Sequence, residues 1–334
     1  MMHHRKLGRT GFEVSALGFG TGAIGGLFVR GDRSEQLRAA ARALEAGITY
    51  FDTAPSYGDG RSEENLGEVL RDLDAWERVV VGTKVRLRPS DLRDPQAAIG
   101  RSIEGSLRRL GRDTVDLLQL HNPIAGKRDT GPLETASGGM LDLDAVLGGV
   151  AEGLHRAVRR GSARYAGITG LGDATALHAL VGAAGFATVQ TYFNVLNPSA
   201  GFPGASGGAQ DFGGLIDKAA GAGMAVIAIR VMAAGAIASA PARHAIAGDP
   251  GAPLVRGAAY SRDLERAHAI KALAMELRAE GPLELALRFV LAKPGVSTVL
   301  VGYSDFAQVE DAIRWAERGP LPEDIVRRLA DGAR

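Results

Sequence analysis

Eight short apolar segments alternate with stretches of helical periodicity, and this alternation constrains the fold more than any other feature of the chain. The apolar segments are residues 15–20, 50–52, 79–84, 114–121, 165–169, 188–192, 225–229 and 297–301. They are continuously apolar, which is typical of parallel strands covered on both faces. The clearest helical stretches are residues 34–46, 63–73, 96–110, 143–160, 174–183 and 210–221.

Eight strands with intervening helices in 334 residues predict one (β/α)8 TIM barrel, a single domain over residues 1–334. The alternative is an open doubly wound sheet, in which a glycine-rich turn follows the first strand. The sequence GFGTGAIGG at 18–26 is weak evidence for such a sheet. Three segments, 122–141, 198–214 and 233–262, exceed ordinary connections, and we expect them to be long loops at the active mouth of the barrel. Tolerated insertions are the alternative reading.

Composition excludes several classes of function. Lys plus Arg number 39 against 38 for Asp plus Glu, so no charge excess favours a nucleic acid or a membrane surface as partner. The chain has no cysteine, which excludes disulfides, thiolate catalysis and cysteine metal sites. No signal-peptide pattern and no apolar run near the roughly 20 residues of a membrane span are present. We therefore expect a cytoplasmic protein without a metal site, and its oligomeric state is open.

Ionisable side chains stand where three neighbouring strands are expected to end. Asp52 and Tyr57 occur in YFDTAPSYG, Lys84 in VVVGTKV and His121 in DLLQLHN. Each of these residues alone has an ordinary explanation as a cap, a packed aromatic or a polar group at the rim. Together they predict one pocket, because the carboxyl ends of parallel strands meet at the same mouth of a barrel.

That set of groups has a coherent chemical use. A phenol is a poor acid near neutrality, and a nearby ammonium group stabilises its phenolate. A carboxylate beside the lysine keeps the ammonium charged, and an imidazole orients a carbonyl oxygen by hydrogen bonding. The assembly would place a proton donor beside a developing alkoxide. General acid catalysis of this kind contributes roughly 10²–10⁴-fold to a rate.

The motifs FDTAPSYG, RSEENLGEVL, GTKV and LLQLHNP, in this order, resemble those of the aldo-keto reductases. The resemblance runs from LGRTGFEVSALGFGTG to VSTVLVGYSDFAQVEDAI, and QTYFNVLNPSA and AGITG look most like the sugar or aldose dehydrogenase branch. It implies a (β/α)8 barrel and a catalytic tetrad of Asp52, Tyr57, Lys84 and His121. Histidine rather than glutamate at 121 implies carbonyl–alcohol interconversion rather than reduction of a carbon–carbon double bond.

The resemblance also implies a nicotinamide cofactor, NADP(H) and in addition NAD(H), extended across the barrel mouth. Contacts to the nicotinamide and its ribose are expected from Gly20, Thr21, Asp52, Thr169, Gly170 and Gln190. Gly170 stands where the family commonly has asparagine, so that side-chain contact is missing.

Residues expected at the other end of the cofactor are Gly302, Tyr303 and Ser304, which precede a helix that starts near Phe306. A helix N-terminus with free amides suits a phosphate.

Four further positions depart from the family pattern. Gln308 replaces an arginine that meets the adenosine 2′-phosphate, and glutamine cannot reproduce a bidentate guanidinium contact. Asp311 and Ala312 replace a common Glu-Asn pair at the adenine. Arg230 is expected to meet the pyrophosphate or to pair with a carboxylate. We therefore expect weaker discrimination between the two cofactors than in strict NADPH enzymes.

The predicted function is NAD(P)(H)-dependent interconversion of a carbonyl compound, an aldehyde, ketone or sugar, with an alcohol. Tyr57 would be the general acid and base. The alternatives are a nucleotide-sensing regulatory or binding subunit and an aldolase-like Schiff base on Lys84. A charged lysine beside Asp52 disfavours the Schiff base. Phe193 and Phe202, in or beside a mouth-side segment, are candidate substrate aromatics, but the physiological substrate and the direction of the reaction are open.

Overall fold

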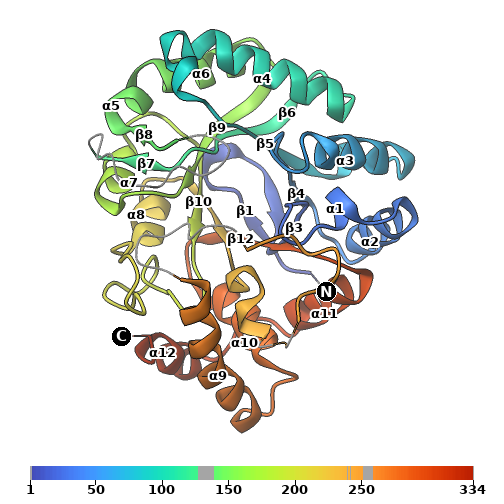
Figure 1. Ribbon diagram of the computed structural model, residues 1–334, viewed down its shortest axis with the longest axis vertical. Helices are drawn as coiled ribbons and strands as arrows, with labels where there is room; N and C mark the ends of the chain where they lie inside the picture. The colour runs from blue at the N-terminus through green and yellow to red at the C-terminus, as the bar shows by residue number, and fades with distance from the viewer. Residues whose placement is uncertain (1, 127–138, 239, 241, 251–258, 334) are drawn as a thin grey trace.

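Eight parallel strands close into a barrel in the computed structural model, which describes residues 2–126, 139–238, 240, 242–250 and 259–333 (Figure 1). The barrel strands are β3 (Leu17–Gly20), β4 (Tyr50–Asp52), β5 (Val80–Val85), β6 (Val115–Leu120), β9 (Ala163–Gly170), β10 (Thr188–Tyr192), β11 (Ala225–Ile229) and β12 (Val296–Gly302). Their order around the barrel is β10-β11-β12-β3-β4-β5-β6-β9, and β9 pairs with β10 to close it. The (β/α)8 prediction is confirmed, and the open-sheet alternative is wrong because the described sheet has no free edge.

The main helices surround this barrel (Figure 1). They are α2 (Arg33–Glu45), α3 (Arg61–Asp72), α4 (Pro95–Leu110), α6 (Ala151–Arg159), α7 (Ala174–Leu180), α8 (Leu215–Gly221), α9 (Tyr260–Glu276), α10 (Pro282–Ala292), α11 (Phe306–Glu317) and α12 (Glu323–Asp331). Shorter elements are α1 (Leu27–Arg30), α5 (Leu143–Ala145), η1 (Gly8–Thr10), η2 (Trp76–Arg78), η3 (Pro89–Arg93), η4 (Val146–Val150) and η5 (Ala233–Ala238).

Two predicted helices differ from the structure, and glycines explain both differences. The stretch predicted as one helix over 143–160 is divided into α5, η4 and α6, with non-helical backbone at Gly148. The stretch predicted over 210–221 becomes helical only at Leu215. The two residues before it, Gly213 and Gly214, have φ of 57° and 76°, in the left-handed region where glycine is favoured.

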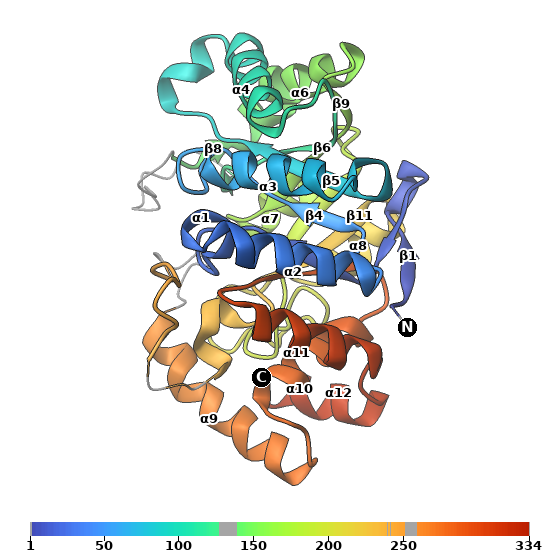
Figure 2. The same cartoon turned by 90° about the vertical axis from the view of Figure 1, so that its right-hand side faces the viewer.

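A hairpin closes one end of the barrel. Strands β1 (His4–Lys6) and β2 (Glu13–Ser15) pair in antiparallel fashion at the right-hand side of Figure 2, away from β8 (Leu141–Asp142). Leu7 and Val14 of this hairpin are fully buried and pack with barrel residues that include Tyr50, Leu117 and Ile227. This small apolar cluster fills the bottom of the barrel, and a larger core lies between the strands and the helices. The opposite mouth is therefore the one available for a site.

The three long segments differ in how much of each is described. Part of 122–141 forms β7 (Ile124–Ala125) and the first residue of β8, which pair in parallel, and residues 127–138 lie outside the described chain. Segment 233–262 contains η5 and the start of α9, and 239, 241 and 251–258 also lie outside it. Segment 198–214 is described throughout as turns and irregular structure.

The aromatic prediction for the substrate pocket is wrong. Phe193 and Phe202 pack against each other and against Phe289 of α10, with ring centroids 5.4–6.3 Å apart. They belong to the core between barrel and helices.

Within the described residues, no helix is long and apolar enough to cross a bilayer.

Candidate active site

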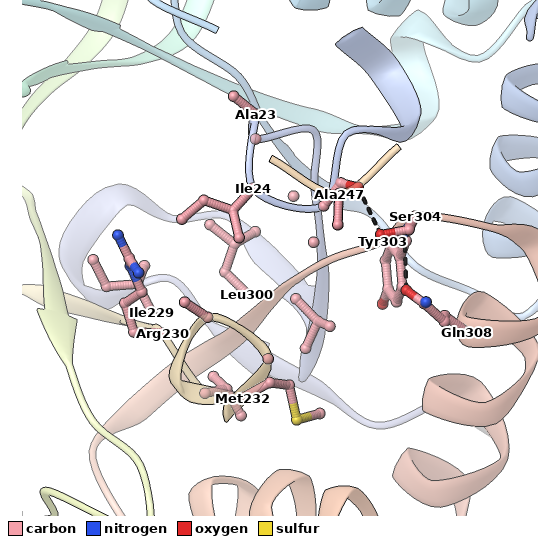
Figure 3. Close-up of a pocket in the computed structure, with 18 of the residues that line it drawn as sticks. Ala23, Ile24, Ile229, Arg230, Met232, Ala247, Leu300, Tyr303, Ser304 and Gln308 are labelled. Atoms are coloured by element: carbon pink, nitrogen blue, oxygen red, sulfur yellow. Dashed lines mark hydrogen bonds between the residues drawn. The ribbon is translucent and has the colours of Figure 1, made fainter. Parts of the chain in front are cut away.

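A cavity of about 610 Å³ opens at the carboxyl ends of the barrel strands. Asp52, Tyr57 and His121, three of the four predicted catalytic residues, line it. Figure 3 shows Ile24, Ile229, Arg230 and Met232 in one part of this cavity and Tyr303, Ser304 and Gln308 in another. The cavity is thus long enough to join the strand-end residues to the N-terminus of α11.

Asp52 and Lys84 form an ion pair behind the cavity wall. The Lys84 ammonium donates to Asp52 Oδ1 and, at 2.8 Å, to the carbonyl oxygen of Thr53. The two side chains are only 1% and 2% exposed. Neighbouring strands β4 and β5 carry them, so the barrel register itself sets their approach. Burial lowers the pKa of Lys84, but the charges of Asp52 and Tyr57 outweigh it and the pKa is raised. The lysine is therefore a permanent cation at physiological pH.

Tyr57 lies between this cation and His121. The Lys84 Nζ atom is 4.9 Å from the centre of the Tyr57 ring, and the His121 ring meets Tyr57 edge-on at 5.7 Å between centroids. Gly58 and Gly60 follow Tyr57 with φ of 65° and 94°, which lets the chain turn sharply into α3. The geometry brings the four residues of the predicted tetrad together.

His121 is the electrically neutral member of this group. It follows β6, and its main-chain amide donates to Val85 at 2.8 Å, which fixes the ring at the cavity wall. Desolvation, followed by the charges of Lys84 and Arg86, lowers the pKa of His121 well below its ordinary value. A neutral imidazole can donate one hydrogen bond from its protonated nitrogen without adding a charge to the cavity.

Three side chains donate hydrogen bonds to the second carboxylate oxygen of Asp52. Two of them were not predicted to be in the site, and the third, Gln190, was predicted to bind the cofactor. Asp52 Oδ2 accepts from Gln190 Nε2 at 2.6 Å, from the Tyr50 hydroxyl at 3.2 Å and from Gln119 Nε2 at 3.4 Å. The missed residues are Tyr50 and Gln119. A sequence signal exists for both, because side chains two positions apart on a strand share a face. Tyr50 precedes Asp52 by two, and Gln119 precedes His121 by two.

Most of the residues predicted to bind a cofactor lie on the cavity wall. These are Gly20, Asp52, Thr169, Gln190, Arg230, Gly302, Tyr303, Ser304 and Gln308, together with Asp311 and Ala312. Two predicted residues do not line it. The Thr21 hydroxyl bonds the carbonyl oxygen of Asp52 at 2.9 Å, and Gly170 lies where a Cβ would come 2.8 Å from the Gln190 carbonyl oxygen. Both serve the packing of the barrel.

Two buried hydroxyls on the wall fit a polar ligand. Thr169 Oγ1 and the Tyr303 hydroxyl are shielded from solvent and have no hydrogen-bond partner among the described residues. Buried polar groups in folded proteins are nearly always paired. Thr169 is at the position predicted to hold the nicotinamide carboxamide, so its free hydroxyl is consistent with that group.

The N-terminus of α11 is already occupied by side chains. Asp305 caps the helix by accepting from the Gln308 amide at 2.8 Å. Gln308 Oε1 accepts from the Ser304 amide at 2.9 Å (Figure 3). Glu35 accepts from the Phe306 amide at 3.2 Å. Three of the amides at this end are thus taken, and the Asp305 carboxylate adds negative charge where a phosphate was predicted.

Arg230 projects into the cavity from a constrained backbone. Its φ of 58° lies in the left-handed region, which is uncommon for a residue with a side chain. Asn194 Nδ2 and the Ala233 amide both donate to the Arg230 carbonyl oxygen, at 2.9 and 2.8 Å, and hold this conformation. One guanidinium nitrogen donates to the Pro250 carbonyl at 3.3 Å.

A model of the Aldo/keto reductase family matches residues 16–332. The chain belongs to the aldo-keto reductase family. It is 38% identical over 130 residues to Aldo-keto reductase YhdN of Bacillus subtilis, covering 36% of this chain and 38% of that protein. It is 32% identical over 168 residues to L-galactose dehydrogenase of Arabidopsis thaliana, covering 50% and 48%. Both matches span less than half of the relative's own length.

A solved aldo-keto reductase shares the fold of the whole chain. The holo form of aldo-keto reductase AKR11C1 from Bacillus halodurans superposes with a TM-score of 0.71 at 24% identity, covering 100% of this chain and 97% of that one. This likeness agrees with the (β/α)8 barrel that the described residues form.

Proposed function

We propose that this aldo-keto reductase interconverts a carbonyl compound and an alcohol by hydride transfer with a nicotinamide cofactor. The observation that carries the proposal is the buried Lys84–Asp52 pair directly behind Tyr57, with neutral His121 across the same cavity. An ion pair with a purely structural role would require neither Tyr57 nor His121 at the cavity surface.

Each residue of the group has a separate role in this proposal. Tyr57 donates its hydroxyl proton to the carbonyl oxygen as that oxygen becomes an alkoxide, and it takes the proton back when an alcohol is oxidised. Lys84 stabilises the phenolate that remains, since a cation beside a phenol favours its ionised form. His121 donates a hydrogen bond to the same substrate oxygen and orients it. A bound nicotinamide supplies or accepts the hydride.

The cofactor would lie along the cavity. Thr169 and Gln190 would hold the carboxamide, Gly20 and Asp52 would face the ribose, and Arg230 would meet the pyrophosphate. Gly302, Tyr303, Ser304 and Gln308 would line the adenosine end. In this arrangement the hydroxyls of Thr169 and Tyr303 would gain the polar partners that they lack among the described residues.

Removing the Tyr57 hydroxyl tests the proposal. Tyr57→Phe should lower kcat by at least about 10²-fold, because general acid catalysis contributes that much, while cofactor affinity stays near that of the native protein. Initial rates with NADH and NADPH against aldehydes, ketones and sugars, with cofactor titration by fluorescence, would measure both.

Tyr165→Phe is the matched control, because it removes a hydroxyl that donates to the Thr10 carbonyl at 2.6 Å, near the closed end of the barrel. Near-native turnover in Tyr57→Phe would refute the acid role. Cofactor binding without any turnover of the native protein would favour the alternative, a nucleotide-sensing subunit.

We propose further that NAD(H) is used with an efficiency comparable to that of NADP(H). Gln308 is tied to the Ser304 amide, and Asp311 places a carboxylate on the cavity wall near it. A 2′-phosphate would therefore meet an amide at position 308, where a guanidinium would be needed for a bidentate contact. Strict dependence on NADPH in the rate screen would contradict this part of the proposal.

More specifically, we propose an activity like that of an aldose or alcohol dehydrogenase. The identity to L-galactose dehydrogenase over half of this chain supports sugars as the first substrates to assay. The protein is proposed to act on a small molecule in the cytoplasm.

A further inference from the structure

Asp52 is held from below by a layer of side chains inside the barrel, and this layer is outside the tetrad. Tyr50 is fully buried, and its ring packs with Leu7, Val14 and Leu117 in the cluster at the barrel bottom. Its hydroxyl is at the upper edge of that cluster, 3.2 Å from Asp52 Oδ2. Since a carboxylate only accepts, Tyr50 must be the donor.

Two glycines make the space that this contact needs. A Cβ on Gly82 of β5 would lie 2.9 Å from the Tyr50 hydroxyl, 3.4 Å from Gln119 Nε2 and 3.5 Å from Asp52 Oδ2. A Cβ on Gly18 of β3 would lie 2.9 Å from the Tyr50 ring. Side chains at both positions would displace the tyrosine, so the strands on either side of β4 leave a slot for it.

The two oxygens of the Asp52 carboxylate have different hydrogen-bond partners. Oδ1 receives Lys84, and Oδ2 receives Tyr50, Gln119 and Gln190. Rotation of the carboxylate would break several of these bonds at once. Hydrogen bonds to an ionised acceptor are about twice as strong as bonds between neutral groups, and the 2.6 Å bond from Gln190 is short enough to belong to this class. The layer therefore keeps Oδ1 aimed at the lysine.

We propose that Tyr50 is a positioning residue, which acts with Gln119 through Asp52 to keep Lys84 charged and fixed behind Tyr57. Burial lowers the pKa of Lys84, and the charge of Asp52, followed by that of Tyr57, offsets this effect. Tyr57 and His121 are the other ionisable groups that interact with Lys84, and Arg86 interacts with both of them. The inference rests on the proposed function only for its kinetic consequence.

The test is Tyr50→Phe, which keeps the buried ring and removes only the hydroxyl. We expect kcat to fall about tenfold with KM little changed, because the substrate contacts are intact and the support of the acid is not. We also expect Lys84 to lose its proton at a lower pH than in the native protein. The chain has only six lysines, so 13C-labelled lysine methylene signals can be assigned with a Lys84→Met variant.

A double-mutant cycle separates this role from a general loss of packing. In the Asp52→Asn background, Tyr50→Phe should lower kcat by less than twofold, since the charge through which the tyrosine acts is gone. Tyr165→Phe is the control for loss of a tyrosine hydroxyl, and its lysine titration should match the native protein. Gln119→Met tests the layer independently and should shift Lys84 in the same direction.

The lysine titration requires no turnover, so the inference and the proposed function can fail separately. A native Lys84 titration in both Tyr50→Phe and Gln119→Met would overturn the inference. Additive losses of kcat in the Asp52→Asn background would also overturn it.

Discussion

At the residue scale, the candidate site consists of polar side chains whose placement depends on strand ends. Asp52 and Lys84 lie where the sequence predicted them. Both are buried in an ion pair, as expected if a charged lysine is to stabilise the phenolate of a neighbouring tyrosine. Thr21 and Gly170 were expected at the cofactor but do not line the cavity. Adjacent strand residues point to opposite faces, so one residue can reach the ligand while the next serves the barrel wall.

We expect the side chain at position 308 to set much of the preference between the two proposed cofactors. Gln308→Arg should raise kcat/KM with NADPH relative to NADH by at least about tenfold, because a guanidinium can pair with the 2′-phosphate and an amide cannot. Steady-state rates with both cofactors measure the ratio. Gln308→Met is the control, since it removes the bond to the Ser304 amide without adding charge. An unchanged ratio in Gln308→Arg would place the 2′-phosphate elsewhere.

At the element scale, α3 and α4 are locked to β5 by a buried carboxylate. Glu63 is fully buried and accepts from Arg109 Nε at 2.7 Å and from the Thr83 hydroxyl at 2.5 Å. Thr83 directly precedes Lys84, so this contact ties the helix layer to the strand that carries the lysine of the proposed tetrad. The helical periodicity of 63–73 and 96–110 predicted both helices but not the pair between them.

Breaking this pair should destabilise the protein strongly. Arg109→Met should lower the free energy of unfolding by about 3–5 kcal/mol, because it leaves Glu63 as an uncompensated buried charge. Denaturant unfolding followed by circular dichroism measures the change. Arg327→Met is the matched control, because its pair with Glu323 is exposed and should contribute at most about 1 kcal/mol. Equal losses in the two variants would show that Arg109 does not compensate a buried charge.

At the scale of the whole molecule, the hairpin of β1 and β2 closes the barrel at the end opposite the cavity. Arg5 anchors it by donating to the Leu291 and Val296 carbonyls at 2.7 and 2.9 Å. Leu7 and Val14 complete the apolar cluster on which Tyr50 rests. The closed end of the barrel therefore contributes to stability, whereas the candidate active site lies at the opposite end.

Truncating this plug should affect stability more than catalysis. Leu7→Ala should lower the free energy of unfolding by about 2–5 kcal/mol through loss of buried area and the cavity left behind. Kinetics on the folded fraction should show KM near the native value. Met275→Ala is the control at a side chain that is 75% exposed, and it should change stability by no more than about 0.5 kcal/mol. A loss in Leu7→Ala as small as that of the control would contradict a role of the hairpin in the core.

Local patterns in the sequence predicted the eight strands, most of the helices and the four residues that meet at the barrel mouth. These patterns are continuous apolar runs, helical periodicity and polar residues at strand ends. Three contacts could be seen only in the folded barrel: which oxygen of Asp52 meets Lys84, the support of the other oxygen by Tyr50 and Gln119, and the place of Asp305 and Gln308 at the N-terminus of α11. These contacts join residues across the barrel or depend on side-chain rotation, and the closure and register of the sheet bring them within hydrogen-bonding distance.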